Sequence, residues 1–336
     1  MFQKKSLLAT LIAGALVIAS GVAHAGATII NPAGTVALGI NAEGHLNTAD
    51  GSITQNSNGY TGLATKFADG SWRDATAPGC LCEGWGVSAN NSIFGSANVA
   101  AGGVQNLTVS SFTTTASTAT SIVTLTSLPG LSVTQAYAPA DNASSVLFKN
   151  VVTIKNNTDS TLNDVKYVRV MDWDVPPTEF SEYVTIKGTG TTSLLEYSHD
   201  DGFASSNPLA STSAIMPGTL NVDFTDVGVA DHGAYFRFNF GTLEQGESYS
   251  FTIFYGAATS EADALSAIGA EGIELYSLGQ SMNGAVTGSP ATFIFGFKGV
   301  GGVAIEPNPT VVPEPASLAL LGVALAGFAV SRRRRA

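Results

Sequence analysis

Apolar residues alternate with serine and threonine in the part of the chain that follows residue 106. The alternation is clearest in residues 107–110, 122–126 and 131–137. A period of two places the apolar side chains on one face of a strand, so these segments predict half-buried β-strands. Pro129-Gly130 predicts a turn between the second and the third of them.

Two longer apolar segments lie on either side of a polar turn. Residues 146–155 and 162–173 have the pattern of strands, and the segment 156–160 between them is polar throughout. The pair predicts either a hairpin or a connection that crosses from one sheet to another. The pattern resembles bacterial immunoglobulin-like sandwich modules, in which an Asn-Asn-Thr turn separates such strands.

One helix is expected among the later strands. Ser260 and Asp263 can form a capping box, and an apolar stripe of Ala264, Leu265 and Ile268 follows it. A glycine at 269 or 272 would end this helix. The later strands are expected at residues 235–240, 249–254 and 292–297.

Composition supports an all-β, sandwich-like fold with one short helix. Only 12% of the residues are charged, 44% are apolar, and 37 are glycine, a balance typical of β-rich exported proteins. We expect one β-rich domain over residues 26–298, with the option of a loop-rich part at 26–106 and a sandwich at 107–298. A linker is expected over residues 299–310.

The first residues have the three parts of a secretory signal. A short basic segment is followed by the apolar stretch 7–18 and by the small residues Ala23 and Ala25. This pattern predicts a signal peptide over residues 1–25, cleaved before Gly26. The alternative is a retained membrane helix, which the short apolar stretch disfavours.

The other end contains Pro313-Glu314-Pro315, the apolar stretch 316–330 and a terminal basic cluster. That cluster consists of Arg332, Arg333, Arg334 and Arg335. These elements, in this order, resemble the PEP-CTERM sorting domain of Gram-negative bacteria that make exopolysaccharide. The resemblance covers residues 311–336, and it implies recognition by an exosortase, a membrane-embedded cysteine transpeptidase-like enzyme. It also implies a final place in the cell envelope, on the outer surface or in the extracellular polysaccharide matrix of a biofilm.

The physical properties of this tail fit a transient anchor in the inner membrane. As a transmembrane helix, residues 316–330 would span roughly 23 Å, which is less than the ~30 Å of a hydrocarbon core. The arginines would remain on the cytoplasmic side. The two prolines keep the tripeptide extended and accessible to a processing enzyme. An ordinary single-pass anchor is the alternative.

The exported part is acidic, because basic residues are concentrated at the two ends of a chain whose formal net charge is −11. Such a surface repels phosphate backbones, so nucleic acid is excluded as a partner. It attracts cations instead. The expected partners are signal peptidase, an exosortase-like enzyme and exopolysaccharide.

Asp172 and Asp174 form the densest candidate site. On a strand they point to the same face while Trp173 points to the other. With Glu179 or Glu182 in the loop that follows, they could bind calcium, which takes about six to eight oxygen ligands. They could instead be the carboxylates of a glycoside hydrolase. The remaining interpretation is a rim of solvated acids beside a core tryptophan.

Two further groups of residues deserve a chemical interpretation. Cys80 and Cys82 are close enough for a local disulfide, although pairing with another chain and free thiols stay open. The segments 199–202 and 231–233 each combine histidine with aspartate, which is sparse for a transition-metal site. No motif of a common catalytic family is present.

The sequence therefore predicts a non-enzymatic exported protein with a structural or binding role and no required cofactor. A glycoside hydrolase and a calcium-stabilised adhesin are the alternatives.

Overall fold

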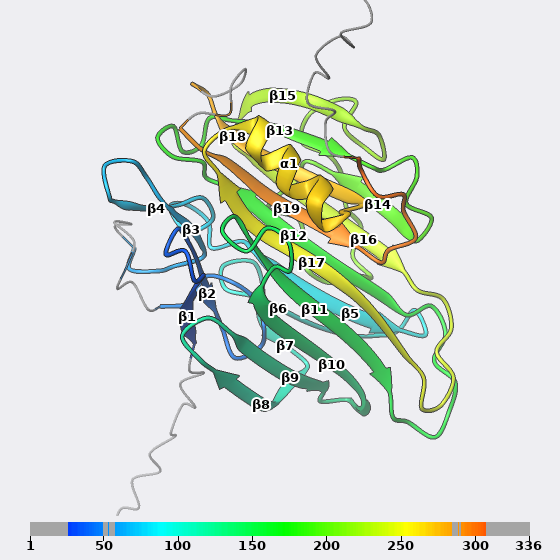
Figure 1. The fold of residues 1–336 in the computed structure, drawn as a ribbon. Coiled ribbons are helices and arrows are strands. Elements are labelled where there is room, and N and C mark those ends of the chain that lie inside the picture. Colours follow the sequence, from blue (N-terminus) through cyan, green and yellow to red (C-terminus); the bar gives the residue numbers. More distant parts are fainter. Residues whose placement is uncertain (1–25, 50–52, 54–57, 284–287, 289, 307–336) are drawn as a thin grey trace, which may run out of the picture.

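The structure is a computed structural model that describes residues 26–49, 53, 58–283, 288 and 290–306. The predicted signal peptide and sorting tail lie outside these residues. Three antiparallel sheets make up the described body, with one α-helix (Figure 1). The predicted all-β class is confirmed.

The two larger sheets form the body of the molecule. The nine-stranded sheet has the order β15 (Phe224–Ala230), β13 (Glu182–Lys187), β18 (Leu275–Ser281), β19 (Thr292–Lys298), β17 (Ser248–Ala258), β11 (Leu147–Asn156), β10 (Leu128–Pro139), β9 (Ala119–Leu125), β8 (Leu107–Thr114). The six-stranded sheet has the order β14 (Leu195–His199), β16 (His232–Asn239), β12 (Lys166–Trp173), β5 (Gly84–Ala89), β6 (Ile93–Asn98), β7 (Gly103–Gln105).

A small third sheet is formed by the first strands of the chain. Its order is β1 (Ala27–Ile30), β2 (Val36–Ile40), β3 (Leu63–Lys66) and β4 (Trp72–Asp74). Its buried side chains, among them Leu38 and Leu63, belong to the same hydrophobic cluster as the residues between the two larger sheets. The three sheets therefore share one core.

Aromatic side chains fill the space between the two larger sheets. Phe236 of β16 packs edge-on against Phe295 and Phe297 of β19, with ring centroids 5.5 and 5.1 Å apart. Tyr167 of β12 meets Phe251 of β17 at 5.1 Å. Each buried aromatic side chain contributes roughly 1.5–3 kcal/mol through removal of apolar surface from water. These contacts help to hold the two sheets together.

The predicted helix is present as α1 (Glu261–Glu271), on the outer face of the nine-stranded sheet (Figure 1). Ser260 is the N-cap, and its hydroxyl accepts a hydrogen bond from the backbone N–H of Asp263. Gly272 ends the helix in the left-handed region, with φ of 65°. Ile268 of the helix packs in one cluster with Ile294, which alternation turns away from the sandwich core.

The connection between β11 and β12 resolves one alternative left open by the sequence. β11 belongs to the nine-stranded sheet and β12 to the six-stranded sheet. The polar turn is therefore a crossover between sheets and not a hairpin. The side chain of Asn156 holds it by donating to the carbonyls of Ser160 and Leu243.

The turn predicted at Pro129-Gly130 lies elsewhere. Both residues are inside β10, at a register shift between Leu128 and Ser132. The chain reverses at residues 126–127, where Asn106 accepts a hydrogen bond from the N–H of Ser127. A proline is tolerated in a strand where an irregularity removes the need for its missing donor.

Two predicted boundaries also differ from the structure. Residues 106 and 107 do not separate two units, because β5–β7 pair into the same sheet as β12. The expected linker does not begin at residue 299. The carboxylate of Glu274 accepts hydrogen bonds from the amides of Gly299, Val300 and Gly302, each at 3.0 Å, and Val300 is fully buried. Residues 299–302 are thus attached to the body.

Among the described residues, no helix is long and apolar enough for a membrane crossing. The predicted transmembrane segment 316–330 lies outside them.

Candidate functional site

The end of β12 places two acidic side chains on the outer face of the six-stranded sheet. Along this strand Val168 and Val170 pack in a small outer cluster, while Met171 and Trp173 belong to the main core. The indole N–H of Trp173 donates to the hydroxyl of Ser277 at 3.1 Å. Strand alternation therefore sends Asp172 outward, as the sequence predicts.

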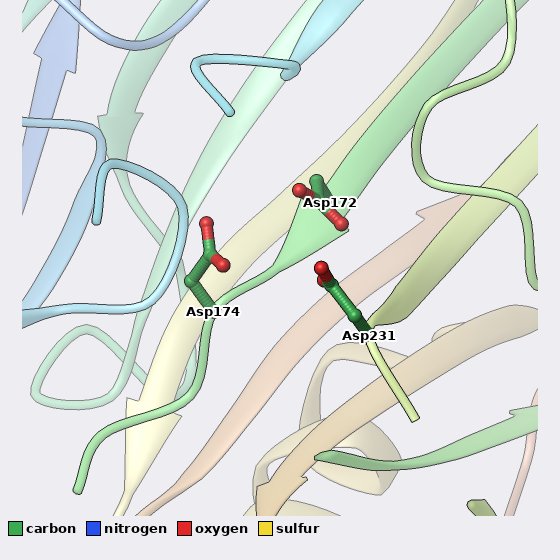
Figure 2. Close-up of side chains that lie close together, drawn as sticks. All are labelled: Asp172, Asp174 and Asp231. Carbon is green, nitrogen blue, oxygen red and sulfur yellow. The ribbon is translucent and has the colours of Figure 1, made fainter. Parts of the chain in front are cut away.

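Asp172, Asp174 and Asp231 form what we call the aspartate cluster (Figure 2). Each contributes one carboxylate oxygen, and these oxygens lie within 4.8 Å of one another. Asp231 comes from the turn between β15 and β16. Asp172 and Asp174 are buried, whereas Asp231 is exposed, so the cluster reaches the surface on the side of Asp231.

The carboxylate of Asp172 is the least satisfied group of the cluster. The residue is 1% exposed, and neither of its oxygens has a hydrogen-bond partner among the described residues. Asp174 has one hydrogen bond, because one of its carboxylate oxygens accepts from the N–H of Gly79 at 3.1 Å. Its other oxygen has no partner among the described residues. A buried charge without compensation is costly, so this arrangement needs a proton or a cation.

Two glycines allow the chain to close over Asp172. A Cβ on Gly202 would lie 2.6 Å from the Cα of Asp172 and 2.9 Å from one of its carboxylate oxygens. A Cβ on Gly233 would lie 2.0 Å from the carbonyl oxygen of Met171. Any larger residue would force the backbone apart at both positions. The glycines therefore account for the burial of Asp172.

Burial raises the pKa of each carboxyl in the cluster. Desolvation, with the added charges of Asp174 and Asp231, raises the pKa of Asp172 to about 9. Desolvation raises the pKa of Asp174 to about 7, although the hydrogen bond from Gly79 opposes the shift. The pKa of Asp231 is also raised by desolvation.

Glu182, the first residue of β13, adds a further carboxylate beside the cluster. One of its oxygens accepts from the N–H of Val175 at 3.1 Å, and the other has no partner among the described residues. Desolvation raises the pKa of Glu182 to about 8, and the charge of Asp174 adds to the shift. Carboxyl groups with raised pKa values are therefore concentrated at this end of the sandwich.

The structure brings together only part of the site predicted from the sequence. Asp172 and Asp174 meet as expected, but the third member is Asp231 and not Glu179. The reason is the pairing of β12 with β16, which places Trp173 opposite His232. The sequence marked 231–233 as a separate candidate, and only the strand order shows that it adjoins Asp172.

Asp200, His232 and Thr219 form a hydrogen-bonded network in the described structure. One ring nitrogen of His232 lies 3.1 Å from the Asp200 carboxylate, and the other lies 3.3 Å from the carbonyl oxygen of Glu182. Asp200 also accepts from the hydroxyl of Thr219 at 2.7 Å. Burial alone would raise the pKa of Asp200, but these hydrogen bonds lower it. Both ring nitrogens of His232 are thus engaged within the protein.

Cys80 and Cys82 form a disulfide, with their Cα atoms 5.0 Å apart. The bridge follows the loop in which Gly79 donates to Asp174.

Comparison with known proteins finds a family match at the C-terminus. Residues 311–335 match the PEP-CTERM protein-sorting motif. The chain carries this sorting motif at its C-terminus. The motif marks it as an exported, envelope-associated protein sorted by an exosortase. The resemblance stated from Pro313-Glu314-Pro315 is thereby confirmed.

A distant likeness to a solved structure covers most of the chain. No curated protein matches the chain. Among solved structures it is similar to a galactose mutarotase-like protein from Lactobacillus casei ATCC 334, with 11% sequence identity. That similarity covers 84% of this chain and 91% of the other, with a TM-score of 0.31.

Proposed function

We propose that this protein is a non-enzymatic component of the cell surface or of the extracellular polysaccharide matrix, with a structural or binding role. The observation that carries the proposal is the sorting motif at residues 311–335, which supports an exported protein that an exosortase sorts. In this proposal the tail anchors the protein in the inner membrane until the exosortase processes it.

The closed geometry of the aspartate cluster supports a role without catalysis. A general acid or base must reach the proton that it transfers, and Asp172 is only 1% exposed. Grooves of about 910 and 700 Å³ lie elsewhere on the described body, and no cluster carboxylate lines either of them. A glycoside hydrolase needs two carboxylates on an accessible cleft. The site fits that alternative poorly.

Intact-mass analysis of the protein from wild-type and exosortase-deficient cells tests this proposal. From wild-type cells we expect a form that begins at Gly26 and lacks the arginine cluster, because the leader and the tail are both processed. Exosortase-deficient cells should retain the tail in the membrane fraction. A full-length tail in both strains would contradict the sorting part of the proposal.

A parallel assay tests the absence of catalysis. The exported protein is incubated with exopolysaccharide from the producing cells, and new reducing ends are measured. We expect none. Reducing ends that appear with the wild type and disappear with Asp174→Asn would overturn the non-enzymatic role.

A further inference from the structure

Asp172 presents a buried carboxylate to a space that no described donor fills. Its side chain is 1% exposed, both oxygens are unpartnered, and two other aspartates direct an oxygen to within 4.8 Å (Figure 2). The three carboxylates would repel one another in a weakly solvated setting. An arrangement built only to pack the protein would place hydrogen-bond donors here. None is found among the described residues around Asp172.

The cluster has one closed side and one open side. Gly202 and Gly233 cover Asp172 so closely that neither position has room for a Cβ. Asp231, in contrast, is exposed. A small ion can therefore enter from the solvent at Asp231 and reach Asp172.

The donor atoms select the kind of ion. All three candidate ligands are carboxylate oxygens, which suit hard cations such as calcium and magnesium. Both ring nitrogens of His232 are engaged in hydrogen bonds, and the two cysteines form a disulfide. These nitrogen and sulfur atoms are therefore not free to bind a metal ion. Magnesium requires near-ideal octahedral geometry and retains its waters, whereas calcium accepts irregular sets of carboxylates. Calcium is also available to a protein outside the cytoplasm.

We propose that Asp172, Asp174 and Asp231 bind one calcium ion that locks this end of the sandwich. The ion joins the end of β12 to the turn between β15 and β16. It also fixes the loop before the disulfide, because the backbone N–H of Asp174 donates to the carbonyl of Ala75 at 2.8 Å and its carboxylate accepts from Gly79. Glu182 adds negative potential beside the ion.

Calorimetry and thermal melting of the exported protein, treated with chelator and then titrated with calcium chloride, test the site. We expect one calcium ion per chain and a melting temperature about 5 °C higher at a calcium concentration of roughly 100 times the dissociation constant. Magnesium chloride should bind at least about tenfold more weakly.

Two variants and one control localise the ion. Asp172→Asn removes the buried charge and should weaken calcium binding by roughly tenfold or more. In chelator this variant should melt at or above the wild-type temperature, because a buried carboxyl group that has no hydrogen-bond partner among the described residues is replaced by a neutral amide, and in calcium it should melt below it. Asp231→Asn, on the exposed side, should weaken binding without disturbing the fold. Asp159→Asn makes the same atomic change in the exposed turn after β11 and should bind calcium as the wild type does.

Two results would overturn the proposal. One is the absence of calcium binding by the wild type at about 10 mM, beyond the range of extracellular calcium modules. The other is binding that persists in both Asp172→Asn and Asp231→Asn, which would place the ion elsewhere. Neither result bears on the sorting of the protein, which the mass analysis tests separately.

Discussion

The guanidinium of Arg169 lies fully buried between the two larger sheets, on the inner face of β12. It forms an ion pair with Glu83, which is also fully buried. It also donates to the amide oxygen of Gln135 at 2.7 Å and to the hydroxyl of Tyr137 at 3.2 Å. Burial opposes the charged form of Arg169, but the charge of Glu83 and the neighbouring tyrosines together outweigh this effect and raise the pKa of Arg169. The pair is therefore fully compensated, in contrast to the aspartate cluster on the outer face of the same strand.

Arg169→Met should destabilise the protein by about 3–5 kcal/mol, because it leaves Glu83 as an uncompensated buried charge. Urea denaturation measures the change in the free energy of unfolding. The matched control is the double variant Glu83→Gln/Arg169→Met, which removes both charges and should recover more than half of the loss. A double variant as unstable as the single one would show that the pair's charges do not determine the loss.

His199 makes stability depend on pH. Its ring stacks on Tyr235 with centroids 4.5 Å apart, and one ring nitrogen accepts from the N–H of Asp201. Burial lowers the pKa of His199 from 6.5 to about 4. Below pH 6.5 His199 is protonated in the unfolded chain but stays neutral in the folded protein. Protonation therefore stabilises the unfolded state, and the free energy of unfolding decreases as the pH falls toward 4.

The prediction for His199 is a loss of about 2 kcal/mol between pH 7 and pH 4.5 that is absent in His199→Gln. The measurement is the free energy of unfolding in urea at both pH values. Other groups titrate equally in the two proteins, so the difference between them isolates this histidine. Equal losses in both would mean that His199 is not held neutral by the fold.

Residue patterns predicted two of the three members of the aspartate cluster. Asp172 and Asp174 are two positions apart, so strand alternation alone places them together. Asp231 joins them through the pairing of β12 with β16, which is a long-range contact that no local pattern encodes. Glu179 was the reasonable guess, because it is near in sequence, and the fold leaves it outside the cluster.

At the scale of elements, the strands that have one face toward solvent could be predicted from the sequence pattern. β9 and β10 show the expected alternation of buried and half-exposed positions. β18 is buried at every position, since the six-stranded sheet covers one face and α1 shields the other. Its sequence lacks the alternation for that reason, and the pattern did not reveal it.

The helix α1 offers a test of its predicted cap. Ser260→Ala removes the hydroxyl that accepts from the N–H of Asp263, and should cost about 1 kcal/mol in the free energy of unfolding. Ser266→Ala makes the same change at an exposed position inside the helix and should be neutral or slightly stabilising, because alanine is the better helix former. Equal effects in urea denaturation would indicate that the cap does not contribute.

At the scale of the whole molecule, the destination was easier to predict than the architecture. Sorting signals are linear, so Pro313-Glu314-Pro315 and the basic cluster can be recognised without a fold. Sheet order is not linear. The strands β5–β7 join a sheet whose other members follow much later in the chain, which is why residues 26–106 looked like a separate region.

The hydrogen bonds from the amides of Gly299, Val300 and Gly302 to the carboxylate of Glu274 fix the point where the chain leaves the body. From Glu306 to Pro313 the backbone can reach at most roughly 24 Å. While the proposed anchor is in the membrane, this short connection keeps the body close to the membrane. It also limits the orientations that the body can adopt. Cutting the tail would then free the orientation of the body as well as its position.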